Sequence, residues 1–185
     1  WQQTVGESLI GKTLGIAGLG NLGGRMAQIA KVFEMNVIAW SQNLTQERCD
    51  EFGVQLVSKD ELMAQSDILT IHLILSDRTR GVINTDDLAR MKSSAYIVNT
   101  ARGPIIDEDA LVAALESKII GGAGIDVFSV EPLPADHAFR NLDNTIITPH
   151  LGYVEEDNYA AYFGGYVEAI DAFLKGEPKN FIGGY

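Results

Sequence analysis

Short apolar runs and longer amphipathic stretches alternate along nearly all of this 185-residue chain. Runs such as KTLGIAG at 12–18, NVIAW at 36–40 and AYIVNT at 95–100 have the composition of buried strands. Between such runs, stretches such as NLGGRMAQIAKVF at 21–33 place apolar residues at helical spacing. Because strands that alternate with helices form parallel sheets with right-handed crossovers, the pattern predicts an α/β fold, a doubly wound parallel sheet covered on both faces.

The same alternation predicts the remaining elements and a single domain over residues 1–185. Further strands are expected at 54–57, 67–75, 121–128 and 144–149, and further helices at 45–52, 58–65, 85–91 and 107–117. A long helix is expected at 155–175, ending near Gly176 and Pro178. The sequence therefore predicts one domain with a helical C-terminal segment.

A glycine-rich turn, GLGNLGG at 18–24, follows the first predicted strand and opens the first predicted helix. In the Gly-x-Gly-x-x-Gly spacing, Gly18 permits the tight turn, Gly20 lets the backbone approach a pyrophosphate, and Gly23 lets helix and strand pack closely. The N–H groups at the start of a helix favour an anion there. A glycine turn without a ligand is the alternative, but the strand–turn–helix context favours a Rossmann-type dinucleotide site that includes Asn21 and Leu22.

The residues after the second predicted strand should contact the ribose of such a dinucleotide. NAD sites usually carry an acid there, about 20 residues beyond the turn, whereas this chain has the neutral Ser41, Gln42 and Asn43. Neutral side chains can bond a ribose hydroxyl or a 2′-phosphate, so the choice between NAD and NADP stays open. We expect no arginine near these residues, so NADP is not positively indicated.

Charge and cysteine content exclude several classes of function. The chain holds 14 Lys and Arg against 25 Asp and Glu, a net charge of −11, without a basic cluster, so nucleic acid and anionic membranes are not expected partners. No apolar run is long enough to span a membrane, and no signal peptide is recognisable. Cys49 is the single cysteine and has acidic neighbours, so we expect an unreactive thiol in a reducing, cytoplasmic compartment.

Polar residues that could perform chemistry follow three of the predicted strands. Arg102 follows the strand at 95–100, Asp126 and Glu131 lie at the end of the strand at 121–128 and in the loop after it, and His150 follows the last strand. The carboxyl ends of parallel strands are where ligands bind in this fold class, so we expect these residues near one another. Taken singly, Glu131 and His150 are more simply a loop charge and a packed ring, and their joint placement favours a site.

Arginine offers a planar fork for a carboxylate, and a histidine supported by a glutamate can exchange a proton near neutral pH. The other histidines, His72 inside a predicted strand and His137 in an acidic loop, have no partner at metal-binding spacing. We therefore expect both to be structural and predict no metal site.

Four motifs together give the chain a family resemblance: GKTLGIAGLGNLG, MKSSAYIVNTARGPIIDEDALVAAL, GGAGIDVFSVEPLP and NTIITPHLGY. The chain resembles the cofactor-binding domain of the D-isomer-specific 2-hydroxyacid dehydrogenases. The resemblance implies that Arg102 binds the carboxylate and carbonyl oxygen of the substrate, that His150 is the acid/base, and that Glu131 orients it. It also implies that Asp126 contacts the nicotinamide carboxamide and that Thr100 belongs to the cofactor site.

The resemblance implies an NAD- or NADP-dependent oxidoreductase that transfers a hydride between nicotinamide and a 2-hydroxy or 2-oxo acid, as glyoxylate/hydroxypyruvate reductases and phosphoglycerate dehydrogenases do. It also implies a homodimer formed through the cofactor domain. The family has a substrate domain, which we expect to be absent from this chain. The alternative is therefore a dinucleotide-binding or sensing module without turnover. One departure from the family pattern is Glu34, where a glycine is common.

Overall fold

The computed structural model describes residue 1 and residues 5–179. The chain forms two compact units, residues 1–150 and residues 151–185, and each is described by itself. The first unit contains the sheet and all but one of the described helices, and the second contains a single long helix.

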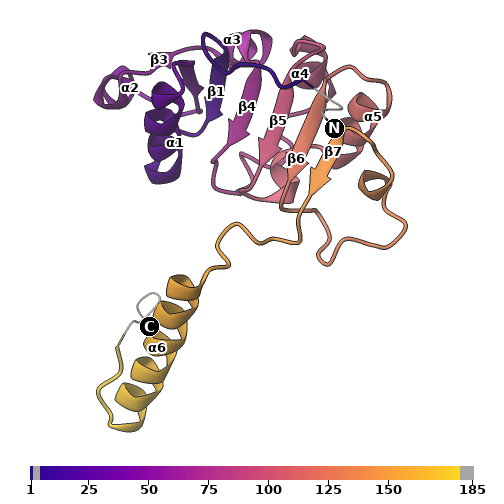
Figure 1. The fold of residues 1–185 in the computed structure, drawn as a ribbon. Helices are drawn as coiled ribbons and strands as arrows, with labels where there is room; N and C mark the ends of the chain where they lie inside the picture. The colour runs from indigo at the N-terminus through magenta and orange to yellow at the C-terminus, as the bar shows by residue number, and fades with distance from the viewer. Residues whose placement is uncertain (2–4, 180–185) are drawn as a thin grey trace. The chain divides into compact units, whose positions relative to one another are not determined.

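A seven-stranded sheet with the order β3-β2-β1-β4-β5-β6-β7 forms the centre of the first unit (Figure 1). Every neighbouring pair of strands is parallel. The strands are β1 (Thr13–Ala17), β2 (Asn36–Trp40), β3 (Gln55–Leu56), β4 (Ile68–Ile71), β5 (Tyr96–Asn99), β6 (Gly122–Ile125) and β7 (Thr145–Ile147). Strand order reverses direction between β1 and β4, so the predicted doubly wound Rossmann-type fold is confirmed.

The helices of this unit follow the strands as the sequence pattern predicts. They are α1 (Asn21–Val32), α2 (Gln46–Phe52), α3 (Lys59–Gln65), α4 (Thr85–Arg90) and α5 (Glu108–Glu116), with 3₁₀ turns η1 (Gly103–Ile105) and η2 (Ala138–Arg140). Side-chain caps fix where several of them begin: Ser58 and Glu61 form a capping box at α3, and Asp107 accepts the Ala110 N–H at α5.

Two apolar clusters on opposite faces of the sheet form the core. Leu14 and Ile16 of β1 point into the cluster that α1 and α2 complete, whereas a side chain at Gly15 would point at Leu62 of α3. Alternate residues of a strand point to opposite faces, and here both faces of β1 are apolar, as expected of a buried parallel strand. The second cluster joins α3, α4 and α5 to β4, β5 and β6.

The helix α1 packs on the sheet through its small residues. Gly23, Gly24, Ala27 and Ala30 are buried, whereas Leu22, which belongs to the apolar stripe that marks this helix in the sequence, is 69% exposed. A methyl group at residue 23 would lie 2.1 Å from the Gly18 carbonyl oxygen, so the close approach of helix and strand requires glycine there.

Two expectations about the sheet need correction. The fourth strand does not continue to Leu75 but ends at Ile71, because its neighbour β1 ends at Ala17 and offers no further ladder partner. His72 therefore lies beyond the strand instead of inside it. Covering of both faces is also incomplete within the first unit, since Tyr96 of β5 is 50% and Ile146 of β7 is 75% exposed.

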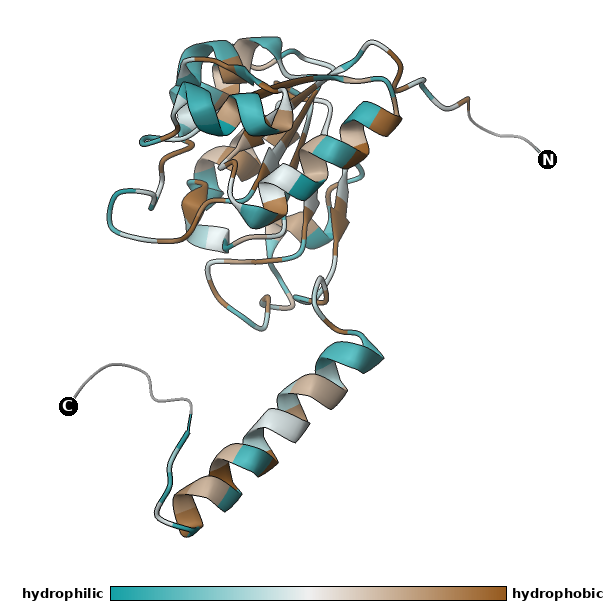
Figure 2. Ribbon diagram, turned by 90° about the vertical axis from the view of Figure 1, so that its left-hand side faces the viewer, coloured by the Kyte–Doolittle hydropathy of each residue, from teal (hydrophilic) through white to brown (hydrophobic). Residues whose placement is uncertain are grey.

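The second unit consists of α6 (Glu156–Leu174), within the range where the sequence predicts a long helix. Glu155 caps its first turn by accepting the Asn158 N–H. Figure 2 shows hydrophobic and hydrophilic residues mixed along this helix, and the rings of Tyr159, Phe163 and Tyr166 contact one another in succession. In the described part of the chain, no helix has the length and apolar character needed to cross a membrane.

Candidate active site

The glycine turn between β1 and α1 has the geometry of a phosphate cradle. Gly18 has φ +101°, and a methyl group there would lie 2.8 Å from the carbonyl oxygen of His72. Gly20 caps α1, and no heavy atom lies within 4 Å of where its side chain would begin. The space over the turn is therefore open to a ligand, and the residues fit a bound pyrophosphate. Asn21 and Leu22 form the exposed first turn of α1 beside it.

A hollow of about 520 Å³ adjoins this turn at the carboxyl ends of β2 and β4. Ser41, Gln42 and Asn43 line it, as expected of residues that meet the ribose. The expectation that no arginine lies nearby is wrong, because Arg48 of α2 and Arg78 of the loop after β4 line the same hollow. The sequence could not reveal Arg78 because only the pairing of β4 with β1 brings its loop beside β2.

His72 also lines this hollow, so it is a wall residue and not part of the apolar core. Its Nε2 lies 3.1 Å from the hydroxyl of Thr70, and burial lowers the pKa of the ring below the ordinary value for histidine. The ring is therefore neutral at pH 7. His137 instead packs on Phe139 and lies 3.4 Å from Glu108, in a structural setting as the sequence suggests.

Asp126 follows β6 directly and is 5% exposed. Its Oδ1 accepts a hydrogen bond of 2.5 Å from the hydroxyl of Thr148, which follows β7, so this bond joins the ends of the last two strands. Sequence reasoning missed Thr148, although its place two residues before His150 is a usable signal. Thr100, after β5, is exposed at the same end of the sheet.

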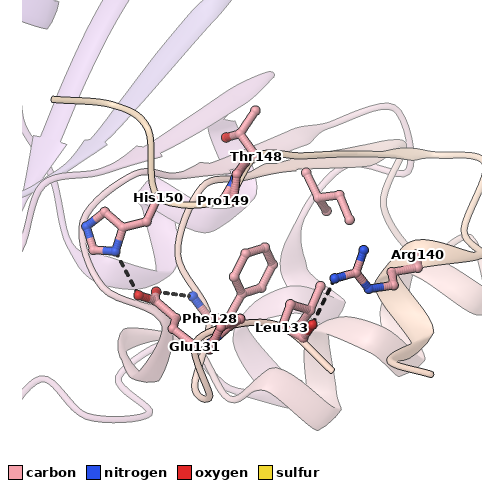
Figure 3. A pocket seen from close by; sticks show the side chains of 9 residues that line it. Phe128, Glu131, Leu133, Arg140, Thr148, Pro149 and His150 are labelled. Carbon is pink, nitrogen blue, oxygen red and sulfur yellow. Dashed lines mark hydrogen bonds and ion pairs between the residues drawn. The ribbon is translucent and has the colours of Figure 1, made fainter. Parts of the chain in front are cut away.

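His150 and Glu131 form a bonded pair although 19 residues separate them. The Nδ1 atom of His150 lies 2.8 Å from Oε2 of Glu131, and the Phe128 N–H donates to Oε1 at 2.9 Å. Figure 3 shows the ring and the carboxylate pointing toward each other from two loops, beside a hollow of about 530 Å³ with Pro132 and Leu133 in its wall. The sequence argument that Glu131 could support His150 has its geometric basis in this contact.

The hydrogen bond from His150 lowers the pKa of Glu131 below its ordinary value, and the Phe128 N–H and the charges of His150 and Arg102 lower it further. The carboxylate therefore stays ionised at neutral pH. Arg102 lies between β5 and η1, directly before η1, and its charge is the smallest of these contributions. Arg102 is itself exposed, and its Nη1 donates to the Ala101 carbonyl at 2.6 Å.

Two residues that sequence reasoning missed hold the Arg102 and Glu131 loops together. A methyl group at Gly103 would lie 2.1 Å from the carbonyl carbon of Phe128, so only glycine lets the Arg102 loop pack on the Glu131 loop. Glu108 of α5 accepts the Ser129 N–H at 3.0 Å. The signal for Gly103 was its place directly after Arg102, whereas Glu108 looked like an ordinary acid in a first helical turn.

His150 has φ +57°, in the left-handed region that few residues other than glycine adopt and that Asn, Asp and His adopt more often than most. Its N–H donates to the Thr148 carbonyl at 3.1 Å, which holds the short turn after β7. The strained backbone directs the ring toward the loop after β6, where Glu131 lies. Glu34 has φ +56°, which explains why a glycine suits that position.

Comparisons with known proteins agree with this arrangement. The family described as "D-isomer specific 2-hydroxyacid dehydrogenase, NAD binding domain" matches residues 1–152. A D-3-phosphoglycerate dehydrogenase of Synechocystis sp. is 41% identical over 97% of this chain and 32% of its own length. A glyoxylate reductase of Aeropyrum pernix is 39% identical over 96% of this chain and 53% of its own length.

Solved structures give the same result. The phosphoglycerate oxidoreductase of Vibrio cholerae has a TM-score of 0.90 at 37% identity, covering 95% of this chain and 58% of that one. An NAD-complexed D-isomer-specific 2-hydroxyacid dehydrogenase of Lactobacillus delbrueckii has a TM-score of 0.81 at 26% identity, covering 97% of this chain and 58% of that one. The chain thus spans about a third to about half the length of the two curated relatives.

Proposed function

The chain belongs to the D-isomer-specific 2-hydroxyacid dehydrogenase family, as its NAD-binding domain, and we propose on this basis that it is the cofactor half of an enzyme that interconverts 2-hydroxy and 2-oxo acids. The observation that supports this most strongly is the His150–Glu131 pair at 2.8 Å, on the same edge of the sheet as the glycine turn. The named relatives are dehydrogenases and reductases, which favours catalysis over a module that only senses dinucleotide.

The glycine turn and the end of β6 would hold the dinucleotide. The space at Gly20 beside the start of α1 is open, and the N–H groups of a helix N-terminus suit a pyrophosphate there. The buried carboxylate of Asp126 suits the amide N–H of the nicotinamide. Bound NAD supplies the hydride acceptor or donor of the reaction.

His150 would move the proton. Because its Nδ1 is bonded to Glu131, Nε2 is the atom that exchanges a proton with the substrate oxygen, and the ionised Glu131 stabilises the charged ring. Such acid–base catalysis is typically worth about 10²–10⁴-fold in rate.

Arg102 would bind and polarise the substrate. Its guanidinium is exposed at the end of β5 and presents a planar fork, which matches a carboxylate and the adjacent carbonyl oxygen of a 2-oxo acid. A lysine would carry the same charge without the two parallel donors.

Turnover of glyoxylate, hydroxypyruvate and 3-phosphohydroxypyruvate with NADH, measured on the protein at its natural length, tests this proposal. We expect at least one of them to be reduced. We expect His150→Ala to lower kcat about 10²–10⁴-fold while NADH affinity stays within about twofold, since the ring acts on the proton and not on the cofactor. An unchanged kcat in the variant would remove His150 from the mechanism.

The homodimer and the cytoplasmic location stay predictions. The buried Cys49, whose pKa is raised by burial and by Asp50, is the unreactive thiol expected for a reducing compartment. Sedimentation equilibrium would test the dimer directly.

A further inference from the structure

The hollow beside the glycine turn has an unusual set of charges for an NAD site. The residues that line it include Arg48, Arg78 and the neutral His72, and none of them is an aspartate or a glutamate. An acid at the end of β2 would accept the ribose hydroxyls and repel a phosphate, whereas this wall carries cations only. On a chain with a net charge of −11, such a local excess of positive charge is notable.

The guanidinium of Arg48 already contacts other residues of this chain. Its Nε donates to the Leu19 carbonyl at 3.1 Å, its guanidinium forms an ion pair with Glu51, and it lies 4.6 Å from the centre of the Phe52 ring. These contacts tie α2 to the glycine turn and give the Arg48 guanidinium a carboxylate partner. Arg48 therefore shapes the hollow more than it offers a binding group.

Arg78 is in a different situation. Its side chain is exposed, and within residues 5–179 no carboxylate lies at ion-pair distance from its guanidinium. Its backbone is nevertheless fixed, because Gln42 donates through Nε2 to the Arg78 carbonyl at 3.1 Å. Thr79 braces the same loop by accepting the Ser76 N–H at 2.8 Å and donating to the Ile74 carbonyl at 2.7 Å.

We propose that this hollow accepts a phosphate on the 2′-oxygen of the adenosine ribose, with Arg78 as the cation that binds it and the Ser41 hydroxyl as a second donor. The protein would then bind NADP(H) at least about as well as NAD(H). The Gln42–Arg78 hydrogen bond supports this, because it holds the arginine loop against the turn that follows β2. The inference rests on the proposed function, since it assumes that the glycine turn holds the pyrophosphate.

Calorimetric titration of the protein at its natural length with NADH and NADPH tests the proposal. We expect NADPH to bind with an affinity within about tenfold of that of NADH or tighter. Arg78→Gln should weaken NADPH binding about tenfold or more and change NADH binding less than about twofold, because only the phosphate contact is lost. The matched control is Arg80→Gln, an exposed arginine two residues away that does not line the hollow, and it should change neither affinity.

Two further measurements isolate the phosphate contact: binding of adenosine nucleotides with and without a 2′-phosphate, and a variant that places an acid after β2. 2′,5′-ADP should bind more tightly than 5′-AMP, and Arg78→Gln should abolish that preference. Ser41→Asp should weaken NADPH about tenfold or more and retain NADH, because the new carboxylate repels a phosphate and accepts ribose hydroxyls.

The outcomes separate the two proposals. NADH binding combined with NADPH binding more than about tenfold weaker would overturn the 2′-phosphate site and leave the proposed function intact. Equal losses for both cofactors in Arg78→Gln would also overturn it, because Arg78 would then serve the common part of the ligand. Failure of both cofactors to bind would overturn both proposals.

Discussion

Glu131 accepts hydrogen bonds from both the His150 ring and the Phe128 N–H, and these bonds give it a lowered pKa. Because its pKa is lower in the folded chain than in the unfolded one, its stabilising contribution is complete above the unfolded pKa of about 4.3. The contribution is lost as pH falls through the lower folded pKa. Since both side chains are about one-third exposed, the pair should stabilise the fold by no more than about 1 kcal/mol.

We therefore expect Glu131→Gln to lower the free energy of unfolding slightly at pH 7 and to match the native chain at the lowest pH where both still fold. Urea unfolding at several pH values measures this difference. The matched control Glu116→Gln, at an exposed position of α5, should show no such dependence. A difference that grows as the solution becomes more acidic would mean that Glu131 is not the ionised partner of His150.

Single residues differ in how far the sequence reveals them. A rule about strand ends predicts that Arg102, Glu131 and His150 lie at the same edge of the sheet, and the sequence is enough to make that prediction. The 2.8 Å contact between Glu131 and His150 depends on loop packing at Gly103, which no spacing rule contains.

Among the structural elements, the glycine turn and α1 offer two positions where an added methyl group should have different effects, one on stability and one on cofactor binding. At Gly23 the group would lie 2.1 Å from a backbone oxygen, so Gly23→Ala should lower the free energy of unfolding by about 2–3 kcal/mol. At Gly20 the group would meet open space, so Gly20→Ala should cost less than about 1 kcal/mol, as a change of helix cap. Because that methyl group occupies the space for the pyrophosphate, NADH affinity should still fall about tenfold or more.

Urea unfolding and calorimetric titration of the two variants give both quantities. Gly53→Ala tests whether the effects follow from loss of any glycine, since Gly53 ends α2 with φ +56° and does not line the hollow. It should lower stability and leave NADH affinity unchanged. Full NADH affinity in Gly20→Ala would show that the pyrophosphate does not lie over this turn.

The order of elements follows from the sequence because buried parallel strands are apolar throughout and helices carry a 3.6-residue period. The sequence predicts less well where each strand or helix ends and which side of a helix faces the sheet. The apolar run from Asp67 to Leu75 outlasts β4, since the length of a strand depends on its neighbour. The sheet-facing side of α1 is made of glycine and alanine, which hydrophobic periodicity underweights.

At the scale of the whole molecule, the site exists because strand order reverses between β1 and β4. In folds of this class ligands bind at the carboxyl ends of the strands beside such a reversal. The glycine turn lines one hollow at these strand ends, and Glu131 and His150 line another. The hydrogen bond from Gln42 to the Arg78 carbonyl joins the loops after β2 and β4, which lie on either side of β1. The sequence predicts the fold class that contains such a reversal, but not which loops meet beside it.

We propose that one edge of the sheet brings the dinucleotide, the guanidinium and the imidazole to the same substrate. A crystal structure of the protein at its natural length with NADH and oxamate, an unreactive analogue of a 2-oxo acid, measures this directly. We predict the pyrophosphate over Gly20, the oxamate carboxylate on Arg102, and the oxamate carbonyl oxygen within hydrogen-bond distance of His150 Nε2. Oxamate bound away from His150, or a dinucleotide bound away from the glycine turn, would show that this edge of the sheet is not the active site.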